Sequence, residues 1–300
     1  MAYRSIMVAH PARISCQLGQ LIVQSDQRFT FPIEDIACLM LESRQSSITT
    51  AALSALAENG TVVYCCDEKH LPCGTLLPFA QHCRQLEVST QQLGIRVPLQ
   101  KRLWQKIVQS KIHNQGECLA LCGKTEKAAW LFSRKKAVAS GDSDNIEAAA
   151  AASYFPELFG DGFTRSNECD GRNAALNYGY AILRGCMARC LCSYGFLPWI
   201  GIHHCSTLNA FNLADDMMEP YRPVVDLYVA ANLDSDVGLN TSVKGQLFDL
   251  LNADILSGKQ HHSVAYAMER QVQSLRKAAE TQSAELLLPL LQPTKRHQYE

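Results

Sequence analysis

The sequence predicts an α+β protein, with a small β-rich domain over residues 1–78 followed by a nearly all-helical domain over residues 99–300. Two patterns along the chain support this division. Before residue 78, short apolar runs alternate with polar residues and end at turn-forming residues, as strands do. From Leu99 onward, apolar residues recur at steps of three and four, which is the period of a helix with one buried face. The polar stretch between them, residues 79–98, is interpreted as a linker.

Residues that favour turns separate the strands expected in the first domain. Pro11, Gly19 and Ser25 with Asp26 punctuate the first four of them. We expect strands at residues 4–9, 12–18, 20–23, 27–31, 36–41 and 61–66. A short helix over residues 49–58 should precede the last strand, because Thr49 or Thr50 can cap its N-terminus and Gly60 follows its end.

The helices of the second domain follow from the apolar spacing. Leu103, Ile107, Val108 and Ile112 define the first of them. Further helices are expected at residues 124–137, 145–154, 173–194, 208–218, 224–232, 243–254 and 261–284. No unit of about 20 to 50 residues repeats, so a solenoid is excluded.

The composition is that of an ordinary folded protein. With 47% hydrophobic and 19% charged residues, global disorder is excluded. No apolar run reaches about 18 residues, so we expect a cytoplasmic protein with no membrane contact. The thirteen cysteines are odd in number and form no CxxC pair, which favours reduced, mostly buried thiols. A net charge of −1 leaves DNA binding open, because phosphate binding depends on local clusters of Lys and Arg.

Three segments carry residues suited to chemistry. In the first, a Gly-Asp turn leads into a helix whose first turn carries Glu147; the alternative is a solvent-facing acid that favours the positive end of the helix dipole. The second is the adjacent pair His203 and His204, where the alternative is packing in the core. In the third, Asp216 and Glu219 lie one helical turn apart. There the alternative is a solvated helix end with Arg222 as counter-ion.

Together these segments offer carboxylates and one imidazole. Two facing carboxylates repel each other unless a cation or a proton lies between them. Oxygen ligands with a single imidazole suit Mg²⁺ or Mn²⁺ better than zinc. Spacing alone does not show that the three segments meet in space.

Several strings in this sequence carry a specific resemblance. They are residues 140–152, 170–183 and 203–226, with residues 102–104 and 111–115 in the first long helix. In this order they resemble the CRISPR-associated adaptation integrase family, the larger of the two universal adaptation subunits. Residues 209–214 and 218–223, together with the compact length, are most similar to its type II branch. The resemblance covers essentially the whole chain.

The resemblance implies a metal centre and an assembly. The family's metal ligands correspond to Glu147, His204 and Glu219, with Asp216 as an additional acid, and the metal would be Mg²⁺ or Mn²⁺. Family members form homodimers, for which residues 1–78 would supply dimer and partner contacts. Two dimers bind the small dimeric adaptation subunit, giving a heterohexamer of four and two copies on double-stranded DNA. A type II effector nuclease is a further candidate partner.

Residues for DNA contact are less specifically indicated. The candidates with phosphate-binding chemistry are Arg165, Lys124, Lys135 and Lys136, each of which could equally be solvated surface. Tyr154 and Tyr178 could line the site, and we expect His203 to support or pack beside it. Tyr180 is assigned to the core.

The implied reaction is direct transesterification. A protospacer 3′-hydroxyl would attack a repeat phosphate in line, and the 3′-oxygen of the array would leave. Two alternatives remain open at this point, namely a non-catalytic DNA-binding scaffold and a free-standing metal-dependent repair nuclease.

Overall fold

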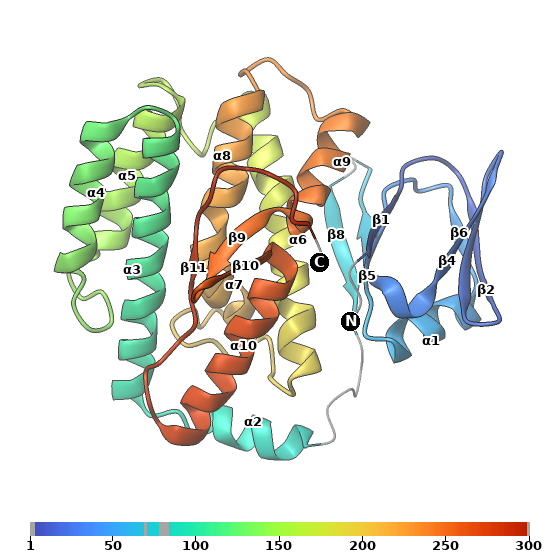
Figure 1. The fold of residues 1–300 in the computed structure, drawn as a ribbon, viewed down its shortest axis with the longest axis horizontal. Coiled ribbons are helices and arrows are strands. Elements are labelled where there is room, and N and C mark those ends of the chain that lie inside the picture. Colours follow the sequence, from blue (N-terminus) through green and yellow to red (C-terminus); the bar gives the residue numbers. More distant parts are fainter. Residues whose placement is uncertain (1–3, 69–70, 78–83, 299–300) are drawn as a thin grey trace.

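The computed structural model describes residues 4–68, 71–77 and 84–298. The N-terminal part contains two four-stranded sheets and one helix (Figure 1). Its elements are β1 (Arg4–Val8), β2 (Arg13–Gln17), β3 (Gln20–Gln24), β4 (Arg28–Pro32), β5 (Ile36–Leu41), β6 (Ser47–Ile48), α1 (Thr50–Glu58), β7 (Val62–Cys66) and β8 (Pro72–Leu76). One sheet has the order β1-β5-β7-β8 and the other β4-β3-β2-β6. The predicted β-rich region with one helix is confirmed.

The sheet containing β5 and β7 is buried on both faces, which explains why both strands are almost continuously apolar. Leu39 and Val63 face the small core beneath α1, whereas Met40 and Tyr64 belong to the larger core of the helical part. The Tyr64 hydroxyl donates to the carbonyl of Ile182, at 2.9 Å, across this boundary. The two parts of the chain therefore share one sheet.

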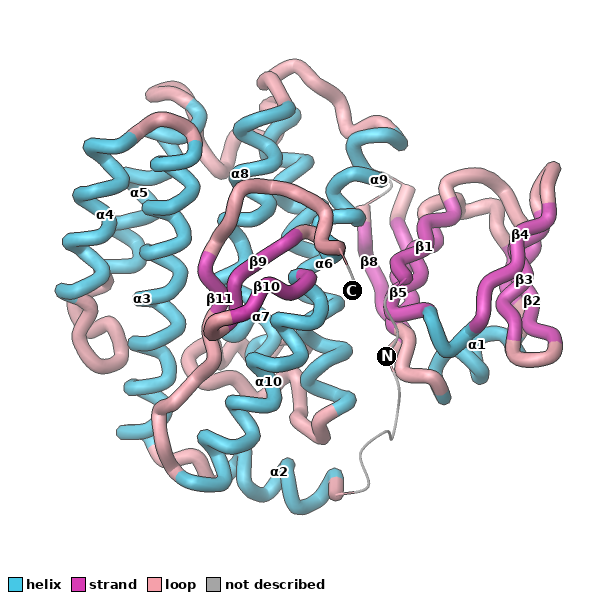
Figure 2. The backbone as a smooth tube through the Cα atoms, viewed as in Figure 1, coloured by secondary structure: helices cyan, strands magenta, loops and turns pink. Residues whose placement is uncertain are grey.

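The remaining chain is mostly helical and surrounds the larger core (Figure 2). Its helices are α2 (Gln85–Leu93), α3 (Val97–Leu121), α4 (Thr125–Ala137), α5 (Ile146–Phe159), α6 (Gly171–Ser193), α7 (Asn212–Met218), α8 (Arg222–Asn232), α9 (Thr241–Asp249) and α10 (Val264–Thr281). A 3-10 turn, Glu219–Tyr221, joins α7 to α8. None of the described helices has the length and hydrophobicity needed to cross a bilayer.

The prediction of a linker at residues 79–98 is wrong for the residues that the structure describes. The first residues of this segment, 79–83, lie outside the described part of the chain, but residues 85–93 form α2 and α3 already begins at Val97. Val88 is buried, and the Gln92 side chain donates to the carbonyls of Leu197 and Ile200. Polar side chains of this segment form hydrogen bonds with a neighbouring loop. Its polar composition therefore resembles that of a linker although the segment is helical.

A small sheet near the C-terminus is a second difference. Strands β9 (Asp254–Ser257), β10 (Gln260–Ser263) and β11 (Pro289–Leu290) have the order β10-β9-β11. The helices expected at residues 243–254 and 261–284 are present as α9 and α10, but α9 ends at Asp249 and α10 begins only at Val264, so strand replaces helix at residue 254 and at residues 261–263. Gly258, with a φ of +70°, allows the tight turn between β9 and β10. The cysteines in the described part are free thiols, as expected, but only four of them are buried: Cys38, Cys118, Cys186 and Cys190.

Candidate active site

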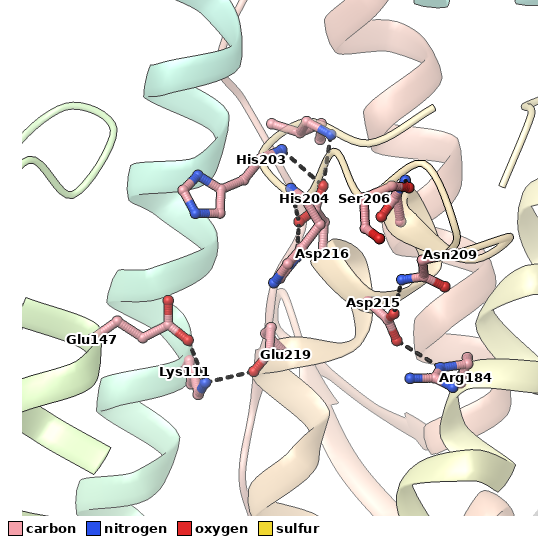
Figure 3. A network of polar contacts seen from close by, with 12 residues as sticks. Lys111, Glu147, Arg184, His203, His204, Ser206, Asn209, Asp215, Asp216 and Glu219 are labelled. Carbon is pink, nitrogen blue, oxygen red and sulfur yellow. Dashed lines mark hydrogen bonds and ion pairs between the residues drawn. The ribbon is translucent and has the colours of Figure 1, made fainter. Parts of the chain in front are cut away.

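Glu147 is placed by the turn that precedes α5. The Asp142 carboxylate accepts the backbone N–H groups of Ile146, at 2.9 Å, and Glu147, at 3.0 Å, and so caps the helix. Asp142 and Asn145 both adopt left-handed conformations, with φ of 51° and 53°, which short polar side chains tolerate. The Glu147 side chain extends from this first turn toward α3 (Figure 3).

Asp216 organises the histidine loop. Its side chain is fully buried on α7 and accepts the backbone N–H groups of Ile202, His203 and His204 at 2.6, 2.9 and 3.1 Å. Its Oδ1 also lies 2.6 Å from His204 Nδ1. Gly201 is required beside it, because a Cβ there would lie 2.1 Å from the His204 carbonyl oxygen.

The bond to Asp216 fixes the state of the His204 ring. A buried carboxylate accepts, so Nδ1 carries the proton and Nε2 is directed away from Asp216. The hydrogen bond that His204 Nδ1 donates to Asp216 raises the His204 pKa, an effect that outweighs the lowering by burial. In Figure 3 the ring is aimed toward Glu219. Asp216 was expected to be an additional acid in the site; in the structure its carboxylate binds and orients the His204 ring.

The His203 ring stacks on Trp104 of α3, with centroids 4.1 Å apart and planes within 1° of parallel. The His204 ring meets the same Trp104 edge-on at 5.7 Å, and the two histidine rings lie 5.5 Å apart at 82° to each other. The adjacent histidines therefore pack against one indole in different orientations, and the His204 ring is the one bonded to Asp216.

Glu219 begins the 3-10 turn after α7 and is buried. Its Oε1 accepts from Arg222 Nε at 2.8 Å, and its Oε2 lies 2.6 Å from Lys111 Nζ. Burial raises the carboxyl pKa, but the charges of Arg222 and Lys111 outweigh burial and hold the pKa at about 2. Asp215, although adjacent to Asp216, turns away to Arg184 and Asn209 (Figure 3).

Lys111 is the functional residue that the sequence analysis missed. Its ammonium lies 2.5 Å from Glu147 Oε1 as well as 2.6 Å from Glu219 Oε2, and so joins α3, α5 and the 3-10 turn. Burial lowers its pKa, but the two carboxylates raise it further, so the net direction is upward and the ammonium stays charged. A signal was present, because Lys111 follows Ile107 and Val108 at helical spacing and falls on the buried face of α3.

The two glutamates offer the oxygen ligands that a hard divalent cation prefers. Glu147 and Glu219 already surround one positive charge, and Glu219 Oε2 is a buried atom without a hydrogen bond of good geometry, despite its ion pair with Lys111. Among residues 4–68, 71–77 and 84–298, no three His, Cys, Asp or Glu side chains converge closely enough to hold a metal. Lys111 stands where the carboxylates would otherwise need another cation.

The DNA-contact candidates fall into two groups. Lys124 and Lys136 are exposed, and Lys135 is half-buried with a pKa lowered by burial. Arg165 donates to the side chains of Asn173 and Asn177, at 2.5 and 2.7 Å.

The prediction that Tyr154 and Tyr178 line the site is wrong. Tyr154 and Tyr178 are fully buried, so neither ring can line a DNA surface. The Tyr154 hydroxyl donates to Asp226 Oδ2 at 3.0 Å, and Tyr180 donates to the same carboxylate, which places Tyr180 in the core as expected. Their aromatic character reflects packing beneath the site.

Fold and site define an α+β chain whose helical part holds two glutamates paired with one buried lysine and a histidine bound to a buried carboxylate. A family model described as "CRISPR associated protein Cas1" matches residues 6–237. The chain is also 43% identical over 307 residues to "CRISPR-associated endonuclease Cas1" of Neisseria meningitidis serogroup C (strain 8013), covering 100% of both proteins. The chain belongs to the Cas1 family.

Solved structures share the fold. A "Casposase bound to integration product" superposes with a TM-score of 0.77 at 18% identity, covering 95% of this chain and 92% of that one. A chain of a "Cas6-RT-Cas1–Cas2 complex" gives 0.72 at 20% identity, covering 95% of this chain and 36% of that one. At such identities the likeness shows the fold alone, and it agrees with the β-rich and helical layout.

Proposed function

We propose that this protein is a CRISPR spacer-acquisition integrase that joins protospacer 3′-hydroxyl ends to a repeat array. The observation that carries the proposal is the convergence of Glu147 and Glu219 on a single cationic centre, beside His204. Family membership and the likeness to a casposase solved with its integration product support the same reaction class.

Mg²⁺ or Mn²⁺ would be held by Glu147, His204 and Glu219. When bound, such an ion polarises a phosphoryl oxygen and offsets the charge that develops on the attacking and leaving oxygens. The incoming 3′-oxygen forms a bond to the repeat phosphorus, and the bond from that phosphorus to the array's 3′-oxygen breaks. The number of phosphodiester bonds is conserved, so the step needs no external energy source and no covalent enzyme intermediate.

The chain's own residues prepare this step. Asp216 holds His204 Nδ1 so that Nε2 is presented to the centre, an arrangement common among histidines that bind metals. Arg222 fixes Glu219 through Oε1 and leaves Oε2 directed toward Lys111. Lys111 shares its single positive charge between the two glutamates until another cation takes its place, and its ammonium is then available to a substrate phosphate.

The proposed partners are double-stranded DNA, a second copy of the chain and the small adaptation subunit. The structure solved as a Cas1–Cas2 complex supports that last partner. An assembly of four and two copies, with an effector nuclease as a further partner, belongs to the same proposal.

A joining assay tests the function. Purified protein with its small partner, Mn²⁺ and a labelled protospacer should join the label to a repeat-containing duplex, and Glu219→Gln should bind DNA yet fail to join it. The conservative change removes one ligand charge without emptying the buried space. DNA binding by the wild type without joining, under any divalent cation, would favour a non-catalytic scaffold. Cleavage that is indifferent to the partner and the repeat would favour a repair nuclease.

A further inference from the structure

A second polar site lies in the C-terminal region, outside the Glu147, His204 and Glu219 cluster. A pocket of about 850 Å³ is bounded by β9, β10 and the chain after β11. Its lining residues are Asp254, Gln260, His261, His262, Lys295, Arg296, His297 and Gln298. Figure 2 shows this small sheet beside α10 with the C-terminal segment close to it.

The buried Asp254 carboxylate orients two histidines that line the pocket. Its side chain is only 4% exposed, and it receives His261 Nδ1 on Oδ2 at 2.6 Å and His297 Nδ1 on Oδ1 at 2.8 Å. A backbone hydrogen bond also joins the C-terminal segment to β9, because the Asp254 N–H donates to the carbonyl of Lys295. One buried carboxylate thus orients two imidazoles and anchors the segment that carries the lysine.

The groups facing the opening are mainly cationic or donors. The Lys295 side chain is 66% exposed, with its ammonium 3.4 Å from Asp254 Oδ2, and Arg296 is 73% exposed, 3.5 Å from Asp249. The His261 side chain is 49% exposed and its Nδ1 bonds to Asp254, which leaves Nε2 for a ligand. His262 contributes less, since burial and the neighbouring Arg270 lower its pKa. The pocket is suited to an oxyanion.

The pocket continues toward the N-terminal sheet. An adjoining hollow of about 400 Å³ shares Arg296 and His297 and adds Arg4, Ser5, Ile6, Phe31 and Asn252. Arg4 pairs with Asp35 at 3.3 Å, so its guanidinium is already held at the rim. Cationic groups are therefore spaced along two joined hollows, which matches a ligand that repeats its phosphates better than a single small anion.

We infer that this pocket, organised by Asp254 and carrying His261, Lys295 and Arg296, binds backbone phosphates of DNA at a position separate from the catalytic cluster. The inference rests on the proposed function for the choice of DNA as the ligand. The phosphate chemistry itself follows from the pocket. Bound there, a duplex is held by contacts to the C-terminal segment that carry no sequence information.

The double variant Lys295→Gln/Arg296→Gln tests the site without touching the core, since both side chains are mostly exposed. Lys259→Gln is a matched control, because Lys259 is exposed on the turn of the same hairpin and does not line the pocket. Affinity for a fluorescent 30-base-pair duplex is measured between 50 and 200 mM NaCl. The double variant should bind at least about fivefold more weakly at low salt, with a salt slope smaller by about 1 to 2. Equal affinity and slope in the wild type, control and double variant would overturn the inference.

Inorganic phosphate distinguishes the sources of the ligand. At matched ionic strength it should raise the melting temperature of the wild type and the control, and do so less for the double variant. Selective phosphate stabilisation with unchanged DNA affinity would overturn DNA as the ligand. Loss of binding to the small partner subunit, with DNA affinity intact, would do the same in favour of an acidic protein surface. Both readouts are binding measurements, so they decide the pocket even if the wild type fails to join DNA and the proposed function falls.

Discussion

Lys111 Nζ lies 2.5 Å from Glu147 Oε1 and 2.6 Å from Glu219 Oε2, although the two acids come from different helical segments more than 70 residues apart. The lysine comes from a third segment, α3, which packs against both α5 and the 3-10 turn. The two glutamates are therefore held near each other by a charge that belongs to the protein, and replacing that charge should have measurable consequences.

Lys111→Met should destabilise the metal-free protein by about 3 kcal/mol, because two partly or fully buried carboxylates lose their shared counter-ion. Added Mn²⁺ should restore most of this loss and should bind the variant more tightly than the wild type, since it no longer competes with the ammonium. Urea denaturation with EDTA or with Mn²⁺ measures both effects. Lys106→Met, an exposed lysine on the same helix, is the control. A variant as stable as the wild type in EDTA would contradict the role assigned to Lys111.

Asp216→Asn should weaken Mn²⁺ binding by about 10- to 100-fold, the range expected when the partner that orients a ligating histidine is removed. Asp215→Asn should leave the affinity nearly unchanged, because that carboxylate faces Arg184 and Asn209. Calorimetric titration of Mn²⁺ into both variants compares neighbouring acids in one helix. Equal losses in both would mean that general negative charge, rather than the bond to His204, sets the affinity.

His204→Ala should abolish joining, whereas His203→Ala should reduce it only partially. The reason is that His204 is directed toward Glu219, while His203 stacks on Trp104 and shapes the loop. Single-turnover joining rates in Mn²⁺, with circular dichroism to verify the fold, give the ranking. The reverse ranking would show that the ligand is assigned to the wrong member of the pair.

Asp226 should make stability depend on pH below neutrality. Burial raises its carboxyl pKa to about 6, against the hydrogen bonds from Tyr180 and Tyr154 that lower it. Because the folded pKa exceeds the unfolded value, its contribution to stability is fully present below about pH 4 and is lost as pH rises through 6. The change amounts to about 3 kcal/mol.

The Asp226→Asn variant should lack this component, so its stability relative to the wild type should increase from pH 4 to pH 7. Urea denaturation across that range measures the difference, with the exposed Asp236→Asn as control. Parallel pH profiles for the wild type and Asp226→Asn would rule out the titration.

Much of the fold could be predicted because its periods are strong. The five- and six-residue strands up to Cys66 and the long helices α3 and α6 follow from apolar spacing that tertiary contacts reinforce, whereas the two-residue strand β6 was not predicted. The short sheet β9–β11 could not, since the predicted helix from residue 261 runs straight into α10 and only Gly258 marks the turn. Strands of two to four residues carry too few side chains for a period to emerge.

The candidate site was predictable in its residues but not in its connections. The family resemblance named Glu147, His204 and Glu219; the structure joins Glu147 and Glu219 through Lys111 and aims the His204 ring toward Glu219. Asp216 accepts hydrogen bonds from backbone N–H groups of the histidine loop instead of pointing toward the glutamates. This arrangement depends on how the loop folds over α7, which the local sequence does not reveal. Tyr154 and Tyr178 were expected to line the site because a single sequence does not distinguish a ring beneath a site from a ring beside it.

The sheet shared by the two parts of the chain limits how the protein can be divided. Met40 and Tyr64 lie in the helical core while Leu39 and Val63 close the other one, and the buried pair of Lys244 with Glu42 crosses the same boundary at 2.8 Å. A fragment ending near residue 78 would expose an apolar sheet face and strand a charged carboxylate. The N-terminal part is thus not a detachable module, because removing it near residue 78 would uncover part of the helical core along with its own.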